Sequence, residues 1–319
     1  MTKKRCWDAY AKHGYRQFVV ANIDLLGQRQ KLWKMAKHNM GDLLKDTISE
    51  ELEQLQLETF VAITHIRDFL DQAILERQSD MNLIEAFDPV DRPAIIEMLQ
   101  SHAVSQNFSD SLVYHVCTAE NLYKPAATIL NILHSVGCVM LMALSRKQPL
   151  RGGIEFHWAG SIGENEIYGP APFMAYYLES HVAQYPRVVI GTRVIAYLNT
   201  LVSQNGSDHP SRIARNLASV ALSMISLDTD GAWFLDYLGD GYRRTYSSKS
   251  RHDTAINFLP DAYSFIVEYQ NDLKQTLEQQ SNSNENKEIS KQIYRYQQLK
   301  DYFDSRQALW VNDGFKFLG

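Results

Sequence analysis

The chain has 319 residues, of which 45% are hydrophobic and 22% charged, and its formal net charge is −5. This length can bury one large core or two modest ones. The small acidic excess, without a long basic block, argues against binding to nucleic acid or an anionic membrane through charge. The three cysteines, Cys6, Cys117 and Cys138, are widely spaced and form no CxxC pair, which argues against a disulfide framework or a zinc site. No signal peptide is evident, so we expect a cytoplasmic protein.

The first informative stretch follows a basic and aromatic arm at residues 2–14. Residues 18–23 are almost all apolar or β-branched, which predicts a strand buried on both faces. Asp24 ends this strand, Gly27 permits a tight turn, and residues 28–40 favour a helix. Such an arrangement can hold a metal ion and a phosphate, because N–H groups at a helix N-terminus attract anions. The alternative interpretation is that Asp24 only caps the following helix.

The next segments predict helices and then a β-hairpin. Apolar residues at helical spacing indicate one long helix or a broken pair over residues 42–78, and a short helix over residues 94–100. Residues 102–117 predict two strands joined by a tight turn at Ser109-Asp110, since short polar side chains supply turn geometry. This turn exposes a second acid, Asp110, although Asp is also a common turn residue without any further role.

The rest of the chain alternates between the two kinds of element. We expect helices over residues 119–147, 171–184, 261–277 and 289–303, strands over residues 150–162, 165–168 and 187–190, and an edge hairpin within residues 220–238. Residues 126–144 are apolar but include Asn131 and His134, so we interpret them as a buried core helix and not as a membrane span. The Gly152-Gly153 pair indicates a bulge or a close approach to the strand.

Several of these segments, in this order, resemble class III nucleotidyl cyclases. More narrowly, they resemble the bacterial pyrimidine cyclases, which form cyclic UMP or cyclic CMP in Pycsar antiphage defence. The residues that carry the resemblance are 20–27, 108–111, 151–154, 168–171, 175–179 and 186–190. It implies an α+β fold, with a mixed, mainly antiparallel sheet flanked by helices. We expect a cyclase-like domain over residues 1–245 and a C-terminal helical extension over residues 246–319.

The resemblance also implies a chemistry. Asp24, Asp110 and the backbone carbonyl of Leu25 would bind two Mg²⁺ or Mn²⁺ ions. One ion would lower the pKa of the ribose 3′-hydroxyl, and the other would neutralise the triphosphate. Backbone N–H groups of Leu26, Gly27 and Gln28 would hold the phosphates. The expected reaction converts a pyrimidine nucleoside triphosphate to its 3′,5′-cyclic monophosphate and pyrophosphate, in a homodimer whose sites are shared between subunits.

The chain departs from the purine-cyclising relatives at positions that matter for catalysis. Phe173 and Tyr177 stand where those relatives carry an Asn and an Arg on one helix. The stabilising cation must therefore come from Arg187, Arg151 or an N-terminal Lys, and Arg187 could equally pair with Glu179. We take Arg187 as the catalytic candidate and Tyr177 as a nucleotide contact.

The residues expected to read the base also differ. Val104 or Ser105 and Glu166 replace the Lys and Asp that read a purine, which favours a pyrimidine. Among pyrimidines we favour UTP, because the nearer resemblance is to uridylate cyclases. The alternative function is a catalytically silent homologue that binds a nucleotide and acts through protein contacts. Retention of Asp24 and Asp110 favours the enzyme.

Overall fold

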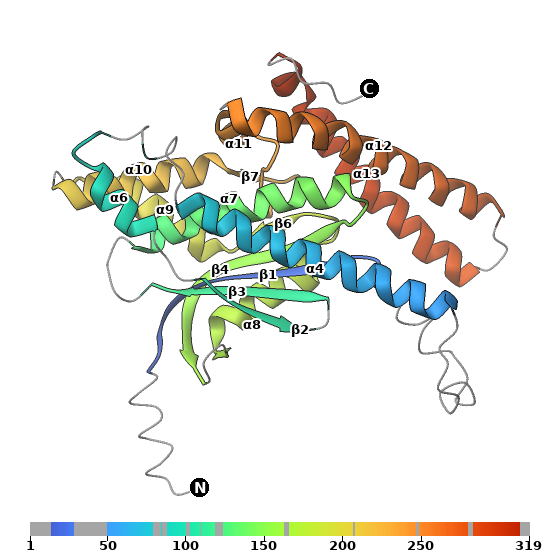
Figure 1. Ribbon diagram of the computed structural model, residues 1–319, viewed down its shortest axis with the longest axis horizontal. Helices are drawn as coiled ribbons and strands as arrows, with labels where there is room; N and C mark the ends of the chain where they lie inside the picture. The colour runs from blue at the N-terminus through green and yellow to red at the C-terminus, as the bar shows by residue number, and fades with distance from the viewer. Residues whose placement is uncertain are drawn as a thin grey trace, which may run out of the picture.

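The protein has a mixed α+β fold in which helices cover both faces of a sheet (Figure 1). The computed structural model describes residues 14–28, 50–78, 84, 88–99, 103–108, 110–118, 124–162, 166–206, 208–246, 249–279 and 283–312. The predictions for the N-terminal arm up to residue 13, and for most of the helix after Gly27, lie outside these residues.

The sheet has eight strands and is mainly antiparallel. Its strands are β1 (Arg16–Leu25), β2 (Val104–Phe108), β3 (Ser111–Cys117), β4 (Leu150–Ser161), β5 (Ile167–Tyr168), β6 (Val188–Ile190), β7 (Ile225–Leu227) and β8 (Trp233–Leu235). They are ordered β2-β3-β1-β4-β6-β8-β7, with β5 paired to the end of β4. Only the pairing of β4 with β6 is parallel. The predicted hairpins at residues 102–117 and 220–238 are confirmed, and β7 forms the predicted edge.

The helices of the described residues differ more from expectation. They are α4 (Glu50–Gln78), α6 (Arg92–Leu99), α7 (Lys124–Ser145), α8 (Pro170–Tyr177), the π-helix η1 (Leu178–Val182), α9 (Thr192–Ser203), α10 (His209–Ser223), α11 (Asp240–Tyr246), α12 (Lys249–Gln279) and α13 (Ser283–Val311). We did not predict α9, α10 or α11. The predicted helix at residues 171–184 changes to π-helical geometry at Leu178 and ends at Val182, and the two C-terminal helices are longer than predicted.

β1 lies at the centre of the sheet and is buried on both faces, as predicted. Successive side chains of a strand point to opposite faces. Val19, Ala21 and Ile23 therefore join the large core beneath α7, while Phe18 and Val20 join a smaller cluster beneath α8. From β1 to β4, the chain follows the βαββαβ order of a ferredoxin-like unit, with β1 and β3 in the middle. Figure 1 shows α4, α7 and α12 above the sheet and α8 below it.

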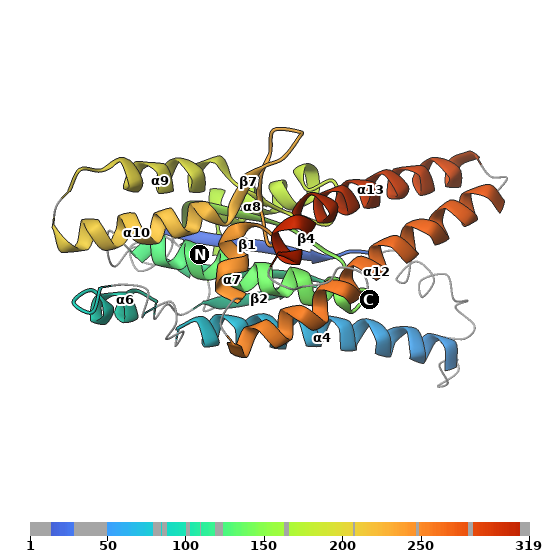
Figure 2. The same cartoon turned by 90° about the horizontal axis from the view of Figure 1, so that it is seen from above.

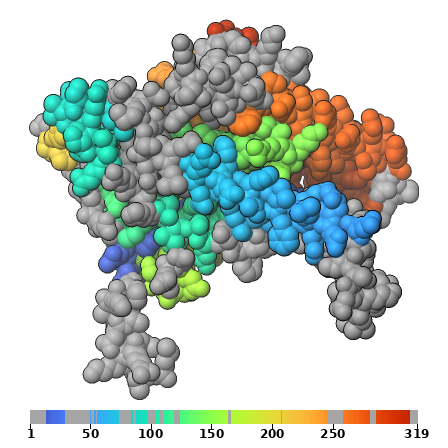
Figure 3. All heavy atoms as spheres, viewed as in Figure 1, coloured from blue at the N-terminus to red at the C-terminus, as the bar shows by residue number. Residues whose placement is uncertain are grey.

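Helix α7 is the predicted core helix. It is the one helix of the described residues that is long and apolar enough to cross a membrane, and 94% of its most apolar window is buried inside the protein. Figure 3 shows α4 lying across this face of the molecule, with part of α7 visible between α4 and α12. The burial of α7 is thus explained by packing within the chain.

The C-terminal helical hairpin, α12 and α13, extends at the opposite end of the molecule from α9 and α10 (Figure 2). α12 packs against α7. Asp236, just after β8, accepts hydrogen bonds from Tyr302 Oη at 3.0 Å and Arg306 Nη2 at 2.7 Å on α13. Trp310 Nε1 donates to the carbonyl of Leu238 at 2.7 Å. The hairpin therefore lies outside the sheet, as predicted, but shares its core. The division into two domains stays a prediction.

Candidate functional site

The end of β1 brings the two predicted acids together. Asp24 lies opposite Ser111 on β3 and opposite Arg151 on β4. The next residue, Leu25, donates its backbone N–H to the carbonyl of Asp110 at 3.3 Å. Asp110 occupies the turn between β2 and β3, as the sequence predicted. The pairing of β1 with β3 thus places both aspartates at the C-terminal end of β1.

The carboxylate of Asp24 is held by two neighbours. Its Oδ1 accepts a hydrogen bond from Ser111 Oγ at 3.1 Å, and its Oδ2 accepts one from Arg151 Nη2 at 3.3 Å. Burial raises the pKa of Asp24, and the negative charge of Asp110 raises it further, whereas Arg151 lowers it. The two acids are therefore close enough to repel each other. A bound cation would relieve this repulsion.

Glu179 is a third acid at this site, and Arg151 joins it to Asp24. Arg151 Nε lies 2.5 Å from Glu179 Oε1, and the Glu179 side chain is only 3% exposed. The alternative pairing of Glu179 with Arg187 is therefore wrong. Gly153 explains the contact, because a Cβ there would lie 2.3 Å from the carbonyl oxygen of Ala175 on α8. The absence of a side chain lets the end of α8 approach β4 and places Glu179 over Arg151. The Gly152-Gly153 pair was the sequence signal for this approach.

Burial raises the pKa of Glu179 to about 7, and the charges of Asp24 and Asp110 add to the effect. Between the ordinary value of 4.5 and about pH 7, the folded chain keeps a proton that the unfolded chain has lost. The free energy of unfolding should therefore fall as the pH rises through this range.

We predict that Glu179→Gln removes this contribution. Urea unfolding in EDTA at pH 5 and pH 8 should show a larger loss of stability for the wild type than for the variant. Asp24, whose pKa is also raised, is present in both proteins, so part of the loss should remain in the variant. Equal losses in the two proteins would mean that Glu179 titrates normally.

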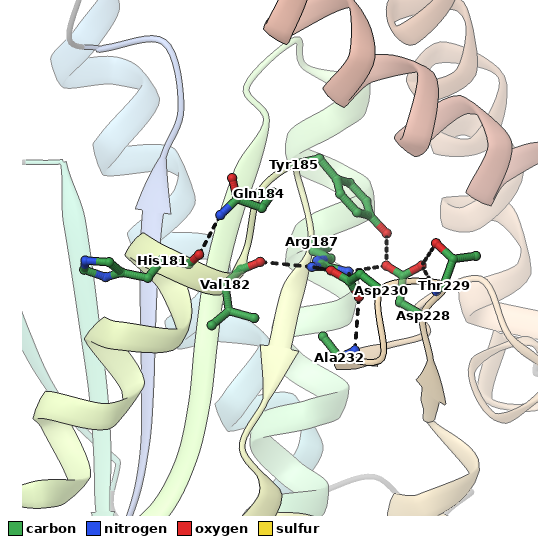
Figure 4. Close-up of polar contacts among 9 residues, drawn as sticks. All are labelled: His181, Val182, Gln184, Tyr185, Arg187, Asp228, Thr229, Asp230 and Ala232. Atoms are coloured by element: carbon green, nitrogen blue, oxygen red, sulfur yellow. Dashed lines mark hydrogen bonds and ion pairs between the residues drawn. The ribbon is translucent and has the colours of Figure 1, made fainter.

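Arg187, the catalytic candidate from the sequence, belongs to a different cluster (Figure 4). Its guanidinium makes ion pairs with Asp228 and Asp230 in the β7–β8 hairpin and donates to the carbonyl of Val182 at 2.9 Å. Tyr185 also donates to Asp228, at 2.5 Å, and its ring lies 4.7 Å from the guanidinium. Arg187 is only 1% exposed. These contacts join the β7–β8 hairpin to the start of β6 and account for the burial of Arg187, while its catalytic role stays a prediction.

The turn after β1 carries the three predicted phosphate contacts, and its geometry bears on one of them. The backbone N–H of Leu26 donates to the carbonyl of Pro149 at 2.9 Å, so this donor is already used and the prediction for Leu26 is corrected. Gly27 has φ +87°, which favours glycine, and it faces open space. Gln28 is 5% exposed, so only a small part of it can reach a ligand. Gly27 and Gln28 thus remain candidates for holding a phosphate.

The register of β2 corrects the prediction for Ser105. Ser105 pairs with Tyr114, which pairs with Ala21, so these residues face α4 and α7. Asp24 points to the other face, since it lies three positions from Ala21. Gln106 pairs with Val113, which pairs with Asn22, and so shares the face of Asp24. Val104 also shares that face. Sequence reasoning missed Gln106, because its face is set by the pairing of β2 with β3 and of β3 with β1.

Glu166 and Tyr177 are the remaining predicted nucleotide contacts, and they lie in different parts of the fold. Glu166 precedes β5, which pairs with the end of β4 at Gly160 and Ser161. Arg151 lies nine positions before Gly160, a distance of about 30 Å at 3.4 Å per residue. Glu166 therefore cannot join Asp24 within one chain. Tyr177, at the end of α8, is 42% exposed and stacks on His181 with ring centroids 4.8 Å apart.

The donor set at the β1 terminus fits Mg²⁺ or Mn²⁺. Both ions prefer oxygen ligands, and Mg²⁺ commonly uses one or two carboxylates together with water and substrate phosphates. Asp24 and Asp110 supply the carboxylates, and Leu25 lies between them. Within the described part of the chain, no three His, Cys, Asp or Glu side chains converge to hold a metal by themselves. The site thus suits a metal that arrives with a phosphate ligand.

Comparison with models of known protein families finds no match to this sequence, and comparison with curated proteins finds no relative. The functional argument therefore depends on the residues and their geometry.

Proposed function

We propose that the protein is a metal-dependent nucleotidyl cyclase of the class III type. It would convert a pyrimidine nucleoside triphosphate, with UTP preferred, to the 3′,5′-cyclic monophosphate and pyrophosphate. The observation that carries this proposal is the pairing of Asp24 and Asp110 at the end of β1, beside Arg151, in a βαββαβ sheet. The cyclic product would be a second messenger in antiphage defence, as the resemblance implies.

Asp24, Asp110 and the carbonyl of Leu25 would hold the metal ions. The ions would supply a lowered pKa for the ribose 3′-hydroxyl and neutralise charge on the phosphates. Gly27 and Gln28 lie beside these acids and would bind the triphosphate through backbone N–H groups. Positioning and charge stabilisation supply most of the catalysis in phosphoryl transfer. No other acid or nucleophile is then needed.

Arg151 is the best candidate for the stabilising cation. It is one of the residues that we considered in place of the missing helix Arg, and its guanidinium already contacts Asp24. Glu179 holds it from the other side. Planar guanidinium groups suit phosphate oxygens, because they donate two parallel hydrogen bonds. When a triphosphate binds, Arg151 could exchange its contact with Asp24 for a phosphate while keeping its contact with Glu179.

Gln106 is our candidate for contact with the base. Its amide can both donate and accept hydrogen bonds, as N3 and the C4 substituent of a pyrimidine require. A mismatch that leaves one buried polar group unpaired costs about 1–3 kcal/mol. An amide can rotate to suit either uracil or cytosine, so Gln106 alone does not choose between them. The preference for UTP comes from the resemblance to uridylate cyclases.

A homodimer is part of the proposal. The position of Glu166, far from Asp24 in the same chain, permits a shared site only if a second chain supplies it. Exposed aromatic side chains on α8 and β5 offer a surface for such an association. These residues are Tyr168, Phe173, Tyr176 and Tyr177.

We expect two inactive variants to restore activity when mixed. In half of the randomly mixed dimers, Asp24→Ala and Glu166→Ala chains would combine to leave one intact site of two. About a quarter of the wild-type rate should therefore return. Mixing Asp24→Ala with Asp110→Ala is the matched control and should restore nothing, because both lesions affect the same half-site. No recovery in confirmed heterodimers of the first pair would indicate sites complete within one chain.

The direct test is the identity of the product. Purified protein should be incubated with ATP, GTP, CTP and UTP at equal concentration with Mn²⁺, and the products identified by mass spectrometry. We expect cyclic UMP in excess over cyclic CMP, with little cyclic AMP or cyclic GMP. Cyclic AMP as the main product would overturn the substrate assignment. Nucleotide binding without any cyclic product would favour the silent homologue, in which Phe173 and Tyr177 have replaced catalytic residues.

A further inference from the structure

A cavity lies on the face of β4 that α9 covers, where the sheet is open on the β6 side. β6 pairs with β4 only over Gly152–Ile154, and the chain then leaves the sheet at Gly191 to begin α9. Between Glu155 and Ala159, the described residues supply no second strand on this side. The opening has a volume of about 250 Å³ and is lined chiefly by Gln17, Phe156, His157, Trp158, Arg193 and Tyr197.

Aromatic side chains form the walls of this cavity. The rings of Phe156 and Tyr197 lie 4.9 Å apart between centroids and are tilted by 54°. Trp158, on the same lining, is 48% exposed, so about half of this large ring is open to solvent. Each ring surface of this kind can stack on a planar ligand. The walls therefore favour a flat, unsaturated ring.

Arg193 supplies a positive charge at the same opening. It is exposed on the first turn of α9, and its guanidinium makes no hydrogen bond or ion pair with another described residue. Arg193 acts electrostatically on Glu155, but the carboxylate of Glu155 has other contacts. Its Oε1 accepts from the N–H of Phe156 at 2.8 Å, and its carboxylate packs against Gly191. Burial raises the pKa of Glu155, and the charge of Arg193 lowers it, although no ion pair joins the two side chains among the described residues. Arg193 is thus available to a bound anion.

His157 lies beside the cavity, but its side chain points to the opposite face of β4 from Phe156 and Trp158. Its Nδ1 accepts the backbone N–H of Trp158 at 2.7 Å, so the neutral ring carries its proton on Nε2. Partial burial and the charge of Arg193 both lower the pKa of His157, which keeps the ring neutral. The amide of Gln17 is a neutral donor on the cavity lining. The cavity thus combines one cation, one neutral donor and three aromatic rings.

We propose that this cavity binds a small planar ring that carries one anionic group, either a carboxylate or a phosphate. The volume lies below the roughly 300–1,000 Å³ of sites for drug-sized ligands, so it suits a single ring and not a nucleoside triphosphate. The ring stacks among Phe156, Trp158 and Tyr197, and the anion meets Arg193. Trp158 lies seven positions from Arg151 along β4, so this site is separate from the acids at the β1 terminus.

The test measures binding directly in the full-length chain carrying Asp24→Ala and Asp110→Ala, in EDTA, so that the result does not depend on cyclase activity. The probes are orotate, benzoate and phenyl phosphate, with uracil as the uncharged ring and acetate as the anion without a ring. Calorimetry or ligand-observed NMR should detect the three charged rings and neither control. Comparing the affinities of orotate and benzoate shows whether the site prefers a pyrimidine or a benzene ring. Comparing phenyl phosphate with benzoate shows whether it prefers a phosphate or a carboxylate.

Two variants locate the binding. Arg193→Gln and Trp158→Ala should each weaken the best probe by about tenfold or more, because the first removes the charged donor and the second a stacking ring. Arg244→Gln, at an exposed arginine on α11, is the matched control and should leave binding unchanged. Both lining variants alter exposed side chains and should fold, which circular dichroism would verify. No binding of any charged ring, or equal binding to wild type and Arg193→Gln, overturns the proposal.

Discussion

Asp24→Asn is expected to abolish cyclisation while leaving the protein at least as stable as the wild type. The loss of activity follows because one of two metal carboxylates disappears, and a metal ion supplies several kcal/mol of charge stabilisation. We therefore expect the rate to fall by about 10²-fold or more. The stability follows from the pKa of Asp24, which burial and Asp110 raise.

A raised pKa means that the folded state disfavours the ionised carboxylate. Near pH 8 without metal, the charge on Asp24 thus lowers the free energy of unfolding, and an uncharged Asn removes that cost. Arg151 keeps Glu179 as a partner in the variant. Functional residues commonly reduce stability in this way.

Product formation by mass spectrometry and urea unfolding in EDTA would measure the two effects. Asp272→Asn, at an exposed acid on α12, is the control and should change neither. Near-normal turnover by Asp24→Asn would rule out the two-metal assignment. A large loss of stability would instead make Asp24 a structural residue.

Arg187→Met is expected to destabilise the fold by about 3–5 kcal/mol, because it leaves the acids of the β7–β8 hairpin without their cation. The guanidinium is nearly inaccessible, and it joins Asp228, Asp230 and the carbonyl of Val182. The hairpin at the sheet edge has only short strands, so few backbone hydrogen bonds could replace this contact. Urea unfolding of wild type and variant measures the difference.

Compensation provides the control for this prediction. Adding Asp228→Asn and Asp230→Asn to Arg187→Met should restore part of the lost stability, since no unpaired carboxylate then remains. Arg244→Met, at an exposed ion pair with Asp240, should cost less than about 1 kcal/mol. If Arg187→Met instead unfolded like the wild type but lost activity, Arg187 would be catalytic after all.

Local patterns predicted the elements that carry the two aspartates. The apolar run at residues 18–23 predicted β1, and the turn at Ser109-Asp110 predicted the β2–β3 hairpin, because both depend on neighbouring residues alone. α10 also had local signals that we did not use. Asp208 caps it by accepting the N–H of Ser211 at 2.9 Å, and Pro210 lies in its first turn.

The partners of charged side chains could not be predicted in this way. Arg151 and Arg187 begin neighbouring strands, and both were candidates for the same role. Arg151 contacts Asp24 and Glu179 because Gly153 admits the backbone of α8, whereas Arg187 contacts the β7–β8 hairpin, about 40 positions later in the chain.

The sequence by itself determined that Asp24 ends a strand and that Asp110 occupies a turn, but Asp24 is more buried than its place at a strand end suggested, with a side chain only 18% exposed. Only the tertiary structure decided which neighbouring side chains lie on the same face of the sheet as Asp24. A shift of one residue in register moves a side chain to the opposite face, which is why Gln106 joins Asp24 and Ser105 does not. Register depends on pairing between segments more than 80 residues apart, such as β1 and β3, and this information is absent from any local pattern.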